Sequence, residues 1–337
     1  MPPRPARFPA SPGRRVTTDA AAVDVRPPRL AASIEVSPGQ VMNRPETLEA
    51  IPPATRVAIV DLGTLEVAEW AAVCRLVAHH GLEPVPHIAA RRVISREALE
   101  ERLAAMSSEA GVRDVLLIGG EADRPAGPFA QTLDVLETGL LDRHGITRIA
   151  VAGHPEGSPA ISGDAIEAAL WFKQAFAERT GADVRIVTQF GFDAGRAIRW
   201  AETLAATGFG LPIHLGVAGP ASVKSLIKYA AICGVKASGR FLARRGGTVA
   251  QLATSHSPEP QVAPMEAHVA ANPHCLIKQF HVFPFGGIAQ AAAWLTERGS
   301  WRADAREVFA SAPAVRGQSQ DRAAGRAAGL SAAWSRK

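Results

Sequence analysis

The sequence predicts an α/β fold, specifically a (β/α)8 TIM barrel. Short, continuously apolar segments recur along the chain, and amphipathic segments separate them. Continuous apolar runs are typical of strands that are buried on both faces, as in a parallel sheet. The eight strand-like runs are ASIEVS (32–37), RVAIVDL (56–62), EPVPHIA (83–89), DVLLIGG (114–120), RIAVAGH (148–154), DVRIVTQF (183–190), PIHLGVAG (212–219) and CLIKQFHVF (275–283).

Helical segments occupy the intervals between these runs. The segments 65–81 and 163–181 carry apolar residues at helical spacing and end on a glycine, and Ser95 opens the segment 95–111 as an N-cap residue. Another helix is expected at 222–234, with extra helical material before the last strand. Eight alternating units fit a closed barrel better than a doubly wound sheet, which usually has about five to seven strands. The GxGxxG and GxxxxGK[ST] nucleotide-binding motifs are absent.

The chain divides into a barrel and two tails. Residues 1–30 are Pro-rich and aperiodic, which predicts a disordered tail, residues 31–300 form the catalytic barrel, and residues 301–337 form a basic C-terminal tail. The formal net charge is +5, and each tail carries +4, which leaves −3 for the barrel. A basic groove for nucleic acid is therefore not expected in the fold.

The composition predicts a cytoplasmic protein with no metal site and no membrane attachment. Cys74, Cys233 and Cys275 form no CxxC pair, which favours reduced thiols over a zinc site. No apolar run approaches the roughly 20 residues that a membrane-spanning helix needs. The N-terminus lacks the apolar core of a secretory signal, although its Arg-rich, acid-poor composition leaves a transit peptide open.

Polar side chains close several of the apolar strands. In a parallel barrel the carboxyl ends of the strands meet around one cavity, so these side chains should converge there. Carboxylates, imidazoles and an amide in one cavity form the default site of a barrel. Taken strand by strand, the residues are Glu35, Asp61, His87, Glu121, His154 with Glu156, and Gln189.

Each of these residues also has a purely structural interpretation. Glu35 could be a core carboxylate in a salt bridge, and His87, which follows a proline, could cap its strand through backbone hydrogen bonds. Glu121 could lie in water on a glycine-containing loop, and Gln189 could satisfy barrel backbone groups. His154 lies in a Pro-containing turn, where a structural role is equally open.

Several segments around these residues resemble the methylenetetrahydrofolate reductase family. The resemblance spans residues 31–298, and its most specific parts are the TQF-F-D pattern and the GHPE turn. The segments, in family order and spacing, are LEPVPHIAARRVISREAL (82–99), VLLIGGEADRPAG (115–127), VAGHPEGSP (151–159), VTQFGFD (187–193) and FHVFPF (280–285), with an SxE-x-SP opening at 33–38.

The resemblance implies reduction of 5,10-methylene-tetrahydrofolate to 5-methyl-tetrahydrofolate by NADH or NADPH through FAD, within one-carbon metabolism and methionine biosynthesis. The substrate's five-membered ring must open to an iminium before it accepts hydride, and opening requires a proton at the departing nitrogen. Glu35 matches the family's general acid, and apolar surroundings disfavour the charged form of a carboxyl group. Hydride chemistry belongs to the cofactors, which the protein positions.

The resemblance also assigns binding roles. Glu121 matches an acidic residue near both flavin and folate, so it is a catalytic and substrate-binding candidate; Gln189 matches the amide that recognises the pterin, and Ser225 stands at a second substrate-facing position. The implied cofactor-binding positions are Asp61, His87, Gly119, Gly120 and His154, with His87 in a loop along the cofactor. The oligomeric state, including a homo-oligomer, stays open.

The sequence departs from the family mainly around the cofactor. Gly119 replaces an arginine, Asp61 a threonine, His154 an aromatic residue, and Gly287 an arginine near the folate tail. The polar and basic residues that hold the flavin ribose and diphosphate in the family are replaced by Ala168, Trp171, Gln174 and Ala175. Loss of cationic donors matters because charge-assisted hydrogen bonds are the strong ones.

Three interpretations remain open at this point. The first is a flavin reductase with a rebuilt phosphate site. The second is a relative without tightly bound flavin, or one that runs toward oxidation in a demethylation pathway. The third is a folate-binding barrel without redox activity, such as a methyl carrier or a partner subunit. The presence of Glu35 argues against the third, because binding alone needs no general acid.

Overall fold

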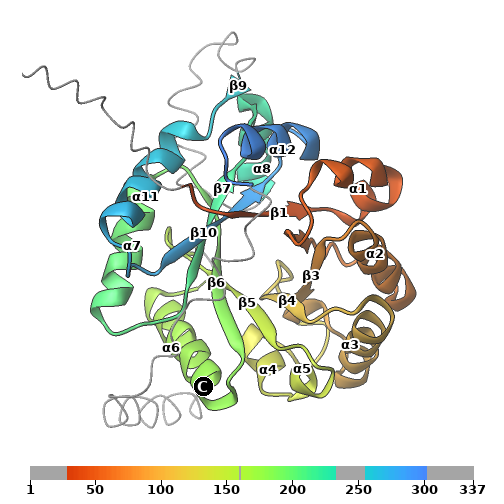
Figure 1. Cartoon of the computed structure of the whole chain (residues 1–337). Helices are drawn as coiled ribbons and strands as arrows, with labels where there is room; N and C mark the ends of the chain where they lie inside the picture. The colour runs from red at the N-terminus through yellow and green to blue at the C-terminus, as the bar shows by residue number, and fades with distance from the viewer. Residues whose placement is uncertain (1–28, 159–160, 233–254, 302–337) are drawn as a thin grey trace, which may run out of the picture.

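The computed structural model describes residues 29–158, 161–232 and 255–301. Most of the two predicted tails, and Cys233, lie outside these residues. Within them, eight parallel strands form a closed barrel in the order β1-β10-β7-β6-β5-β4-β3-β2, which confirms the predicted fold class (Figure 1). The strands are β1 (Ala32–Val36), β2 (Arg56–Ile59), β3 (Glu83–Ala89), β4 (Asp114–Ile118), β5 (Arg148–Gly153), β6 (Asp183–Gly191), β7 (Ile213–Ala218) and β10 (Ile277–Phe283).

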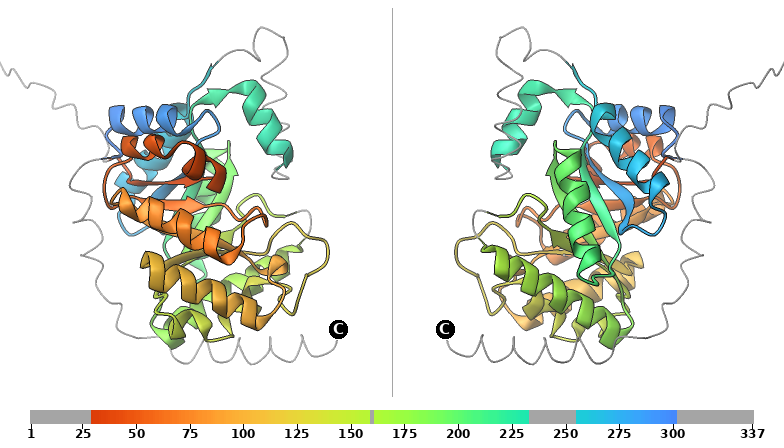
Figure 2. Two further views of the ribbon diagram at one scale, coloured as in Figure 1. Left: turned by 90° about the vertical axis from the view of Figure 1, so that its right-hand side faces the viewer. Right: turned by 90° about the vertical axis from the view of Figure 1, so that its left-hand side faces the viewer.

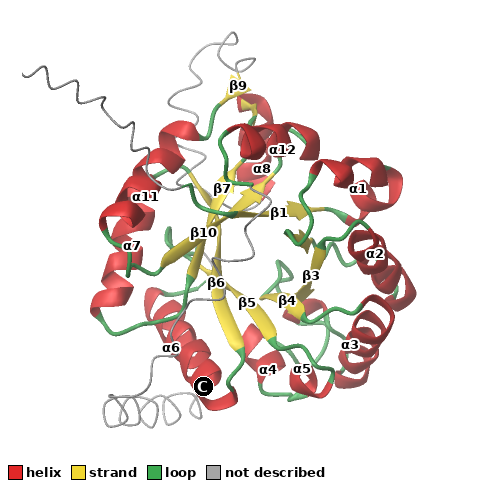
Figure 3. Cartoon of the chain, in the orientation of Figure 1, coloured by secondary structure: helices red, strands yellow, loops and turns green. Residues whose placement is uncertain are grey.

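Helices surround the barrel on its outer face (Figure 3). The predicted segments appear as α2 (Val67–His79), α3 (Arg96–Ala110), α6 (Gly163–Thr180) and α8 (Val223–Ile232). Ser95 caps α3 as predicted, because its side chain accepts a hydrogen bond from the amide of Ala98. The other helical elements are α1 (Pro38–Asn43), η1 (Pro45–Ala50), η2 (Ala90–Arg92), α4 (Thr132–Leu136), α5 (Leu140–Arg143), α7 (Ala194–Ala206), α11 (Glu259–Ala271) and α12 (Ile288–Glu297).

The connection after β7 contains a feature that the sequence did not predict. The two-residue strands β8 (Ala221–Ser222) and β9 (Ser255–His256) pair antiparallel outside the barrel. Helix α8 follows β8, and the side views show it standing out from the body of the barrel (Figure 2). Leu226 and Ala230 of α8 are buried in a cluster with aromatic side chains of β6 and β10. Helix α8 therefore packs against aromatic side chains at one side of the barrel end.

The strands alternate between an outer apolar face and the barrel interior. On β1, Ile34 and Val36 are buried in the large cluster shared with the helices, whereas Ser33 and Glu35 contact interior side chains. Alternation of this kind follows from the two-residue period of a strand. Inside the barrel, an apolar level consists of Val85, Leu116, Ala150 and Val187.

The amino-terminal end of the barrel is filled by charged side chains. Asp114 is completely buried and accepts a hydrogen bond from Nη2 of Arg185 at 2.9 Å. Arg56 and Arg148 lie 3.3 and 3.4 Å from the second oxygen of Asp114. These pairs separate the solvent below the barrel from the apolar level above, so the open end lies at the carboxyl ends of the strands.

None of the helices among the described residues combines the length and the apolar composition that a bilayer span requires.

Candidate active site

The carboxyl group of Glu35 lies between two histidine rings inside the barrel. Oε2 of Glu35 is 3.6 Å from Nε2 of His87 on β3 and 3.6 Å from Nε2 of His281 on β10. The side chain of Glu35 is 17% exposed, whereas both histidines are buried. The two rings therefore lie against the carboxyl group without a hydrogen bond to it, and part of the Glu35 side chain stays accessible.

The orientation of His281 is set by Ser33. Oγ of Ser33 lies 2.9 Å from Nδ1 of His281 and donates a longer hydrogen bond, 3.4 Å, to the carbonyl of Phe280. If the hydroxyl proton points to that carbonyl, Nδ1 must carry the ring proton and donate to Ser33. Nε2 of His281 is then an acceptor that faces Glu35.

His87 is a buried, neutral imidazole. Burial lowers the pKa of His87 to about 4, and the nearby Glu35 carboxyl opposes this shift only in part. Neither ring nitrogen has a hydrogen-bond partner among the residues that the structure describes. His87 lies within strand β3, as the predicted strand 83–89 has it, rather than in the loop that the resemblance implies, and the two-residue period turns its side chain into the barrel. Its predicted contact with a cofactor stays a prediction.

Asp61 belongs to a buried ion pair. Its Oδ2 lies 2.9 Å from Nη1 of Arg102, and its two oxygens accept hydrogen bonds from the amides of Gly63 and Ala89. Burial works to raise the pKa of Asp61, but the charge and hydrogen bonds of Arg102 and the two amides outweigh burial and lower it. The carboxylate is thus engaged within the protein, and its predicted role toward a cofactor stays a prediction.

Gln189 lies at an irregularity of strand β6. The register with β7 shifts between Val187 and Phe190, and the side-chain Oε1 of Gln189 accepts a hydrogen bond from the amide of Phe190. Gly216 allows this arrangement, because a Cβ at that position would lie 2.4 Å from the carbonyl oxygen of Thr188. Gln189 is exposed despite its position in the barrel sheet. Its amide nitrogen is thus available to a ligand.

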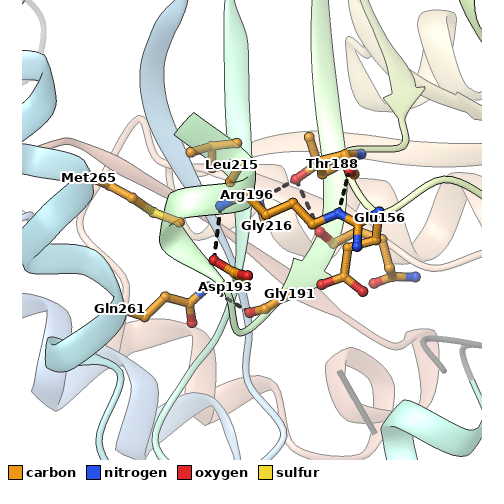
Figure 4. A pocket seen from close by; sticks show the side chains of 12 residues that line it. Glu156, Thr188, Gly191, Asp193, Arg196, Leu215, Gly216, Gln261 and Met265 are labelled. Carbon is orange, nitrogen blue, oxygen red and sulfur yellow. Dashed lines mark hydrogen bonds between the residues drawn. The ribbon is translucent and has the colours of Figure 1, made fainter. Parts of the chain in front are cut away.

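A small pocket of about 20 Å³ lies beside Gln189, between β6, α7 and α11. Asp193 caps α7 there by accepting from the amide of Arg196, and Nε2 of Gln261 donates to the carbonyl of Gly191 (Figure 4). Glu156, from the turn after β5, also lines this pocket. The volume suits one water molecule rather than a cofactor. The hydrogen bonds of Asp193 and Gln261 therefore serve to support the end of β6.

The loop after β4 brings glycines next to the mouth. Gly120 has a φ of +86°, and a Cβ there would lie 3.3 Å from that of Ala89, so a larger residue would be strained and crowded. A Cβ at Gly119 would meet nothing within 4 Å. Glu121, the next residue, is exposed. The loop therefore presents the backbone of Gly119 and Gly120, which carry no side chains, next to the exposed carboxylate of Glu121.

His154 follows β5 above a buried lysine. Nζ of Lys173, on α6, donates to the carbonyl of Ala152 at 2.9 Å, and burial lowers the pKa of Lys173 to about 8. Burial, and secondarily the charge of Lys173, also lower the pKa of His154. Both groups stand at the carboxyl end of β5, so the imidazole is expected to be neutral there at neutral pH.

Ser225 lies in the first turn of α8, where its Oγ is 3.0 Å from Oγ of Ser222. Aromatic side chains pack under this helix: Phe190 contacts Phe283 and Phe285 edge to face, and Tyr229 stacks on Phe285 at 4.4 Å. The β6–β10 side of the site is therefore aromatic, whereas the β1–β3 side carries ionisable groups.

The implied flavin fits this site only in part. The glycine loop after β4 presents backbone without side chains, but α6, which is described over its whole length, offers no free cation for a diphosphate. Its basic side chains are Lys173, bonded to Ala152, and Arg179, which donates to Glu137. Trp171 packs edge to face on Phe209, and Gln174 accepts from the amide of Gly210, so both point to the α7–β7 connection. The family's way of holding the flavin diphosphate on this helix does not fit this chain.

Sequence reasoning singled out Glu35 and His87 but missed His281, Ser33 and Arg102. His281 lies two residues from the interior positions 279 and 283 of its strand, and Ser33 lies two residues from position 35 of its own. Strand alternation in QFHVF and SIE is the signal that would have identified them. Arg102 gave no such signal, because one arginine on a helix is usually solvated.

The fold and this gathering of ionisable groups at the barrel mouth are those of (β/α)8-barrel enzymes, whose sites lie at the carboxyl ends of the strands. Comparison with known proteins then gives the family. The model of the methylenetetrahydrofolate reductase family matches residues 24–246. The chain belongs to this family, as the resemblance in the sequence suggested.

A curated relative supports this assignment. The chain is 32% identical over 158 residues to a 5,10-methylenetetrahydrofolate reductase of Pectobacterium carotovorum subsp. carotovorum. The match covers 46% of this chain and 50% of the relative, so the chain spans about half the length of that protein.

Solved structures with a similar overall fold include two dihydropteroate synthases. The enzyme from Thermus thermophilus has a TM-score of 0.41 and 14% identity, over 81% of this chain and 95% of that one. The enzyme from Yersinia pestis has a TM-score of 0.39 and 16% identity, over 81% and 94% of the two chains.

The buried histidines make folding stability depend on pH. The pKa of His87 is lowered to about 4, and that of His214, at the charged end of the barrel, lies well below its usual value because of burial and nearby arginines. The unfolded chain therefore binds protons that the folded chain does not as pH falls below about 6.5. We expect urea unfolding to show lower stability at pH 5 than at pH 7.5.

The His87→Gln variant isolates the share of one histidine. Because glutamine does not titrate, the loss of stability between pH 7.5 and pH 5 should be smaller in this variant than in the parent protein. Equal stability of the parent protein at the two pH values would contradict the neutral, buried state of these rings.

Proposed function

We propose that the protein interconverts 5,10-methylene- and 5-methyl-tetrahydrofolate, with NADH or NADPH as the hydride donor in the reducing direction. The observation that supports this proposal most is the carboxyl group of Glu35, placed between His87 and His281 at the barrel mouth. A binding protein without redox activity has no need for an acid held in this way.

Glu35 supplies the proton that opens the five-membered ring of the substrate. A nitrogen of that ring must be protonated before the carbon–nitrogen bond breaks, and the resulting iminium accepts hydride at the one-carbon unit. The net change is one hydride and one proton added to the methylene carbon and the departing nitrogen. His281, oriented by Ser33, lies 3.6 Å from the carboxyl group of Glu35 and is proposed to accept a hydrogen bond from its acid form once the substrate is bound.

The reduced pterin is proposed to lie across the mouth, between the ionisable and the aromatic sides. Gln189 offers an amide that donates and accepts, which suits the alternating donors and acceptors of a pterin edge. Glu121 is proposed to accept hydrogen bonds from the same ring system, and Ser225 is proposed to contact the substrate from α8. On the aromatic side, the partly buried Phe285, which packs against the buried Phe190 and Phe283, is proposed to offer apolar surface to the remaining ring faces.

The first prediction concerns the acid. Replacement of Glu35 by glutamine keeps the shape of the side chain and removes the transferable proton. Methylene-to-methyl reduction should fall by about 10²–10⁴-fold, the usual contribution of a general acid, while the folate dissociation constant changes little. Steady-state turnover and folate titration by intrinsic fluorescence measure the two quantities. Unchanged turnover would remove Glu35 from the mechanism.

A second prediction concerns pterin recognition. Gln189→Ala should weaken folate binding by about 3–10-fold, which corresponds to the loss of roughly one neutral hydrogen bond. Gln174→Ala is the matched control, because Gln174 bonds to Gly210 on the outside of the barrel and should leave the dissociation constant unaltered. Equal affinities of the parent protein and the Gln189 variant would exclude Gln189 from the folate site.

The third prediction concerns the cofactor. Because α6 provides no free cation for a flavin diphosphate, the freshly purified protein should show no flavin absorbance near 450 nm and should turn over with a nicotinamide alone. A yellow protein with stoichiometric flavin that requires FAD for turnover would show that the diphosphate binds elsewhere on the rim. Folate binding without turnover by either route would favour the non-redox interpretation.

A further inference from the structure

Strand β3, which carries His87, lacks a neighbouring strand on the β2 side of its carboxyl end. Strand β2 pairs with β3 only from Arg56 to Ile59, opposite Glu83 to Pro86. In the part of the chain that the structure describes, β2 therefore offers β3 no register partner beyond Pro86. In a parallel ladder, a neighbouring strand would bind the carbonyl of residue i of β3 and the amide of residue i + 2 of the same strand.

Side chains take the place of the missing strand. Nη2 of Arg102 donates to the carbonyl of His87, and Oδ2 of Asp61 accepts from the amide of Ala89. These are the two backbone groups that a parallel neighbour would have bound. The second guanidinium nitrogen, Nη1, lies 2.9 Å from Asp61, so the two substituting groups are themselves joined.

This ion pair is held from outside the barrel as well. The guanidinium of Arg102, which comes from α3, lies 4.0 Å from the ring centre of Trp70 on α2. Asp61 and Arg102 are both buried or nearly so. Removal of one member of a buried ion pair strongly destabilises the folded protein, because the other charge is left unpaired. The pair is therefore expected to stay formed and to fix the backbone of β3 at His87.

We propose that His87 is a positioning residue for Glu35, and that the Asp61–Arg102 pair sets its place. Oε2 of Glu35 lies equally far, 3.6 Å, from the two ring nitrogens. This separation is longer than a hydrogen bond, and neither Nε2 has a hydrogen-bond partner among the described residues, so the two rings confine the carboxyl group by contact. Because the ion pair fixes His87, the carboxyl group keeps one position beside the two rings.

The inference rests on the proposed function, and it changes the role of Asp61. In the family resemblance Asp61 stands at a cofactor-binding position. Here its effect on turnover passes through His87, so the two residues form one functional unit. The groups that face His87 are Glu35, His281, Asp61 and Arg102.

A double-mutant cycle tests this coupling. His87→Gln should lower kcat by about 10–100-fold and change the KM for methylene-tetrahydrofolate by no more than about threefold, because His87 acts on the acid rather than on binding. Asp61→Asn should also lower kcat in the parent protein but have no further effect in the His87→Gln background. Glu109→Gln, on the same helix as Arg102 but in an exposed pair with Arg75, is the control and should change nothing.

The outcomes separate the inference from the proposed function. Turnover by the parent protein tests the function, whereas the variants test the inference. Full activity of His87→Gln, or independent losses from Asp61→Asn and His87→Gln that multiply in the double variant, would overturn it. If Asp61→Asn melts below the assay temperature, Arg102→Lys replaces it, because lysine keeps the charge and loses the bidentate geometry.

A readout without turnover completes the test. In histidine-labelled, unliganded protein, Asp61→Asn should shift the ring resonances of His87 in NMR spectra and leave those of His214, at the opposite end of the barrel, unchanged. Unaltered His87 resonances would show that the ion pair does not position this ring.

Discussion

Closure of the sheet by β1 is the constraint on which the site depends. Strand β1 pairs with β2 on one side and with β10 on the other, so residues far apart in the sequence become neighbours inside the barrel. The register places Glu35 opposite Ala58 and Ser33 opposite His281. Without closure, the imidazoles of β3 and β10 would not face the same carboxyl group.

The closed interior also decides which groups are charged. Polar side chains inside a barrel lose water, and this loss favours the neutral forms of histidine and lysine. His87 and His214 therefore stay neutral, whereas Asp61 stays charged because Arg102 and two amides compensate for its burial. The charged cluster around Asp114 fills the opposite end of the barrel. The amino-terminal end of the barrel is thus structural, whereas the carboxyl-terminal end carries the candidate site.

The sequence was sufficient to predict the fold, because each barrel strand is a continuous apolar run and the runs alternate with helices. Glu35 and Gln189 could be singled out because polar residues are conspicuous within such runs. The pairing of Glu35 with His87 and His281 could not be predicted, since it depends on strand order and register across the closed sheet. The register shift beside Gln189 likewise depends on Gly216, which lies in another strand.

On the cofactor side, the contacts of the α6 side chains differ from those that the resemblance implies, whereas the role of Asp61 toward a cofactor stays a prediction. The resemblance implies that Asp61 and positions 168, 171, 174 and 175 of α6 contact a bound nucleotide cofactor. In the structure Asp61 replaces a missing strand, and Trp171 and Gln174 support the α7–β7 connection. A residue's place in a motif does not fix the direction of its side chain, which follows from the local backbone and from the partners that it finds there.

The most direct measurement of the central claim is a crystal structure of the protein with bound 5-methyl-tetrahydrofolate. The account predicts that the pterin lies in the barrel mouth, with the carboxyl group of Glu35 within hydrogen-bond distance of the folate and the rings of His87 and His281 on either side of that carboxyl group. A folate bound elsewhere on the barrel, with Glu35 out of reach, would contradict it.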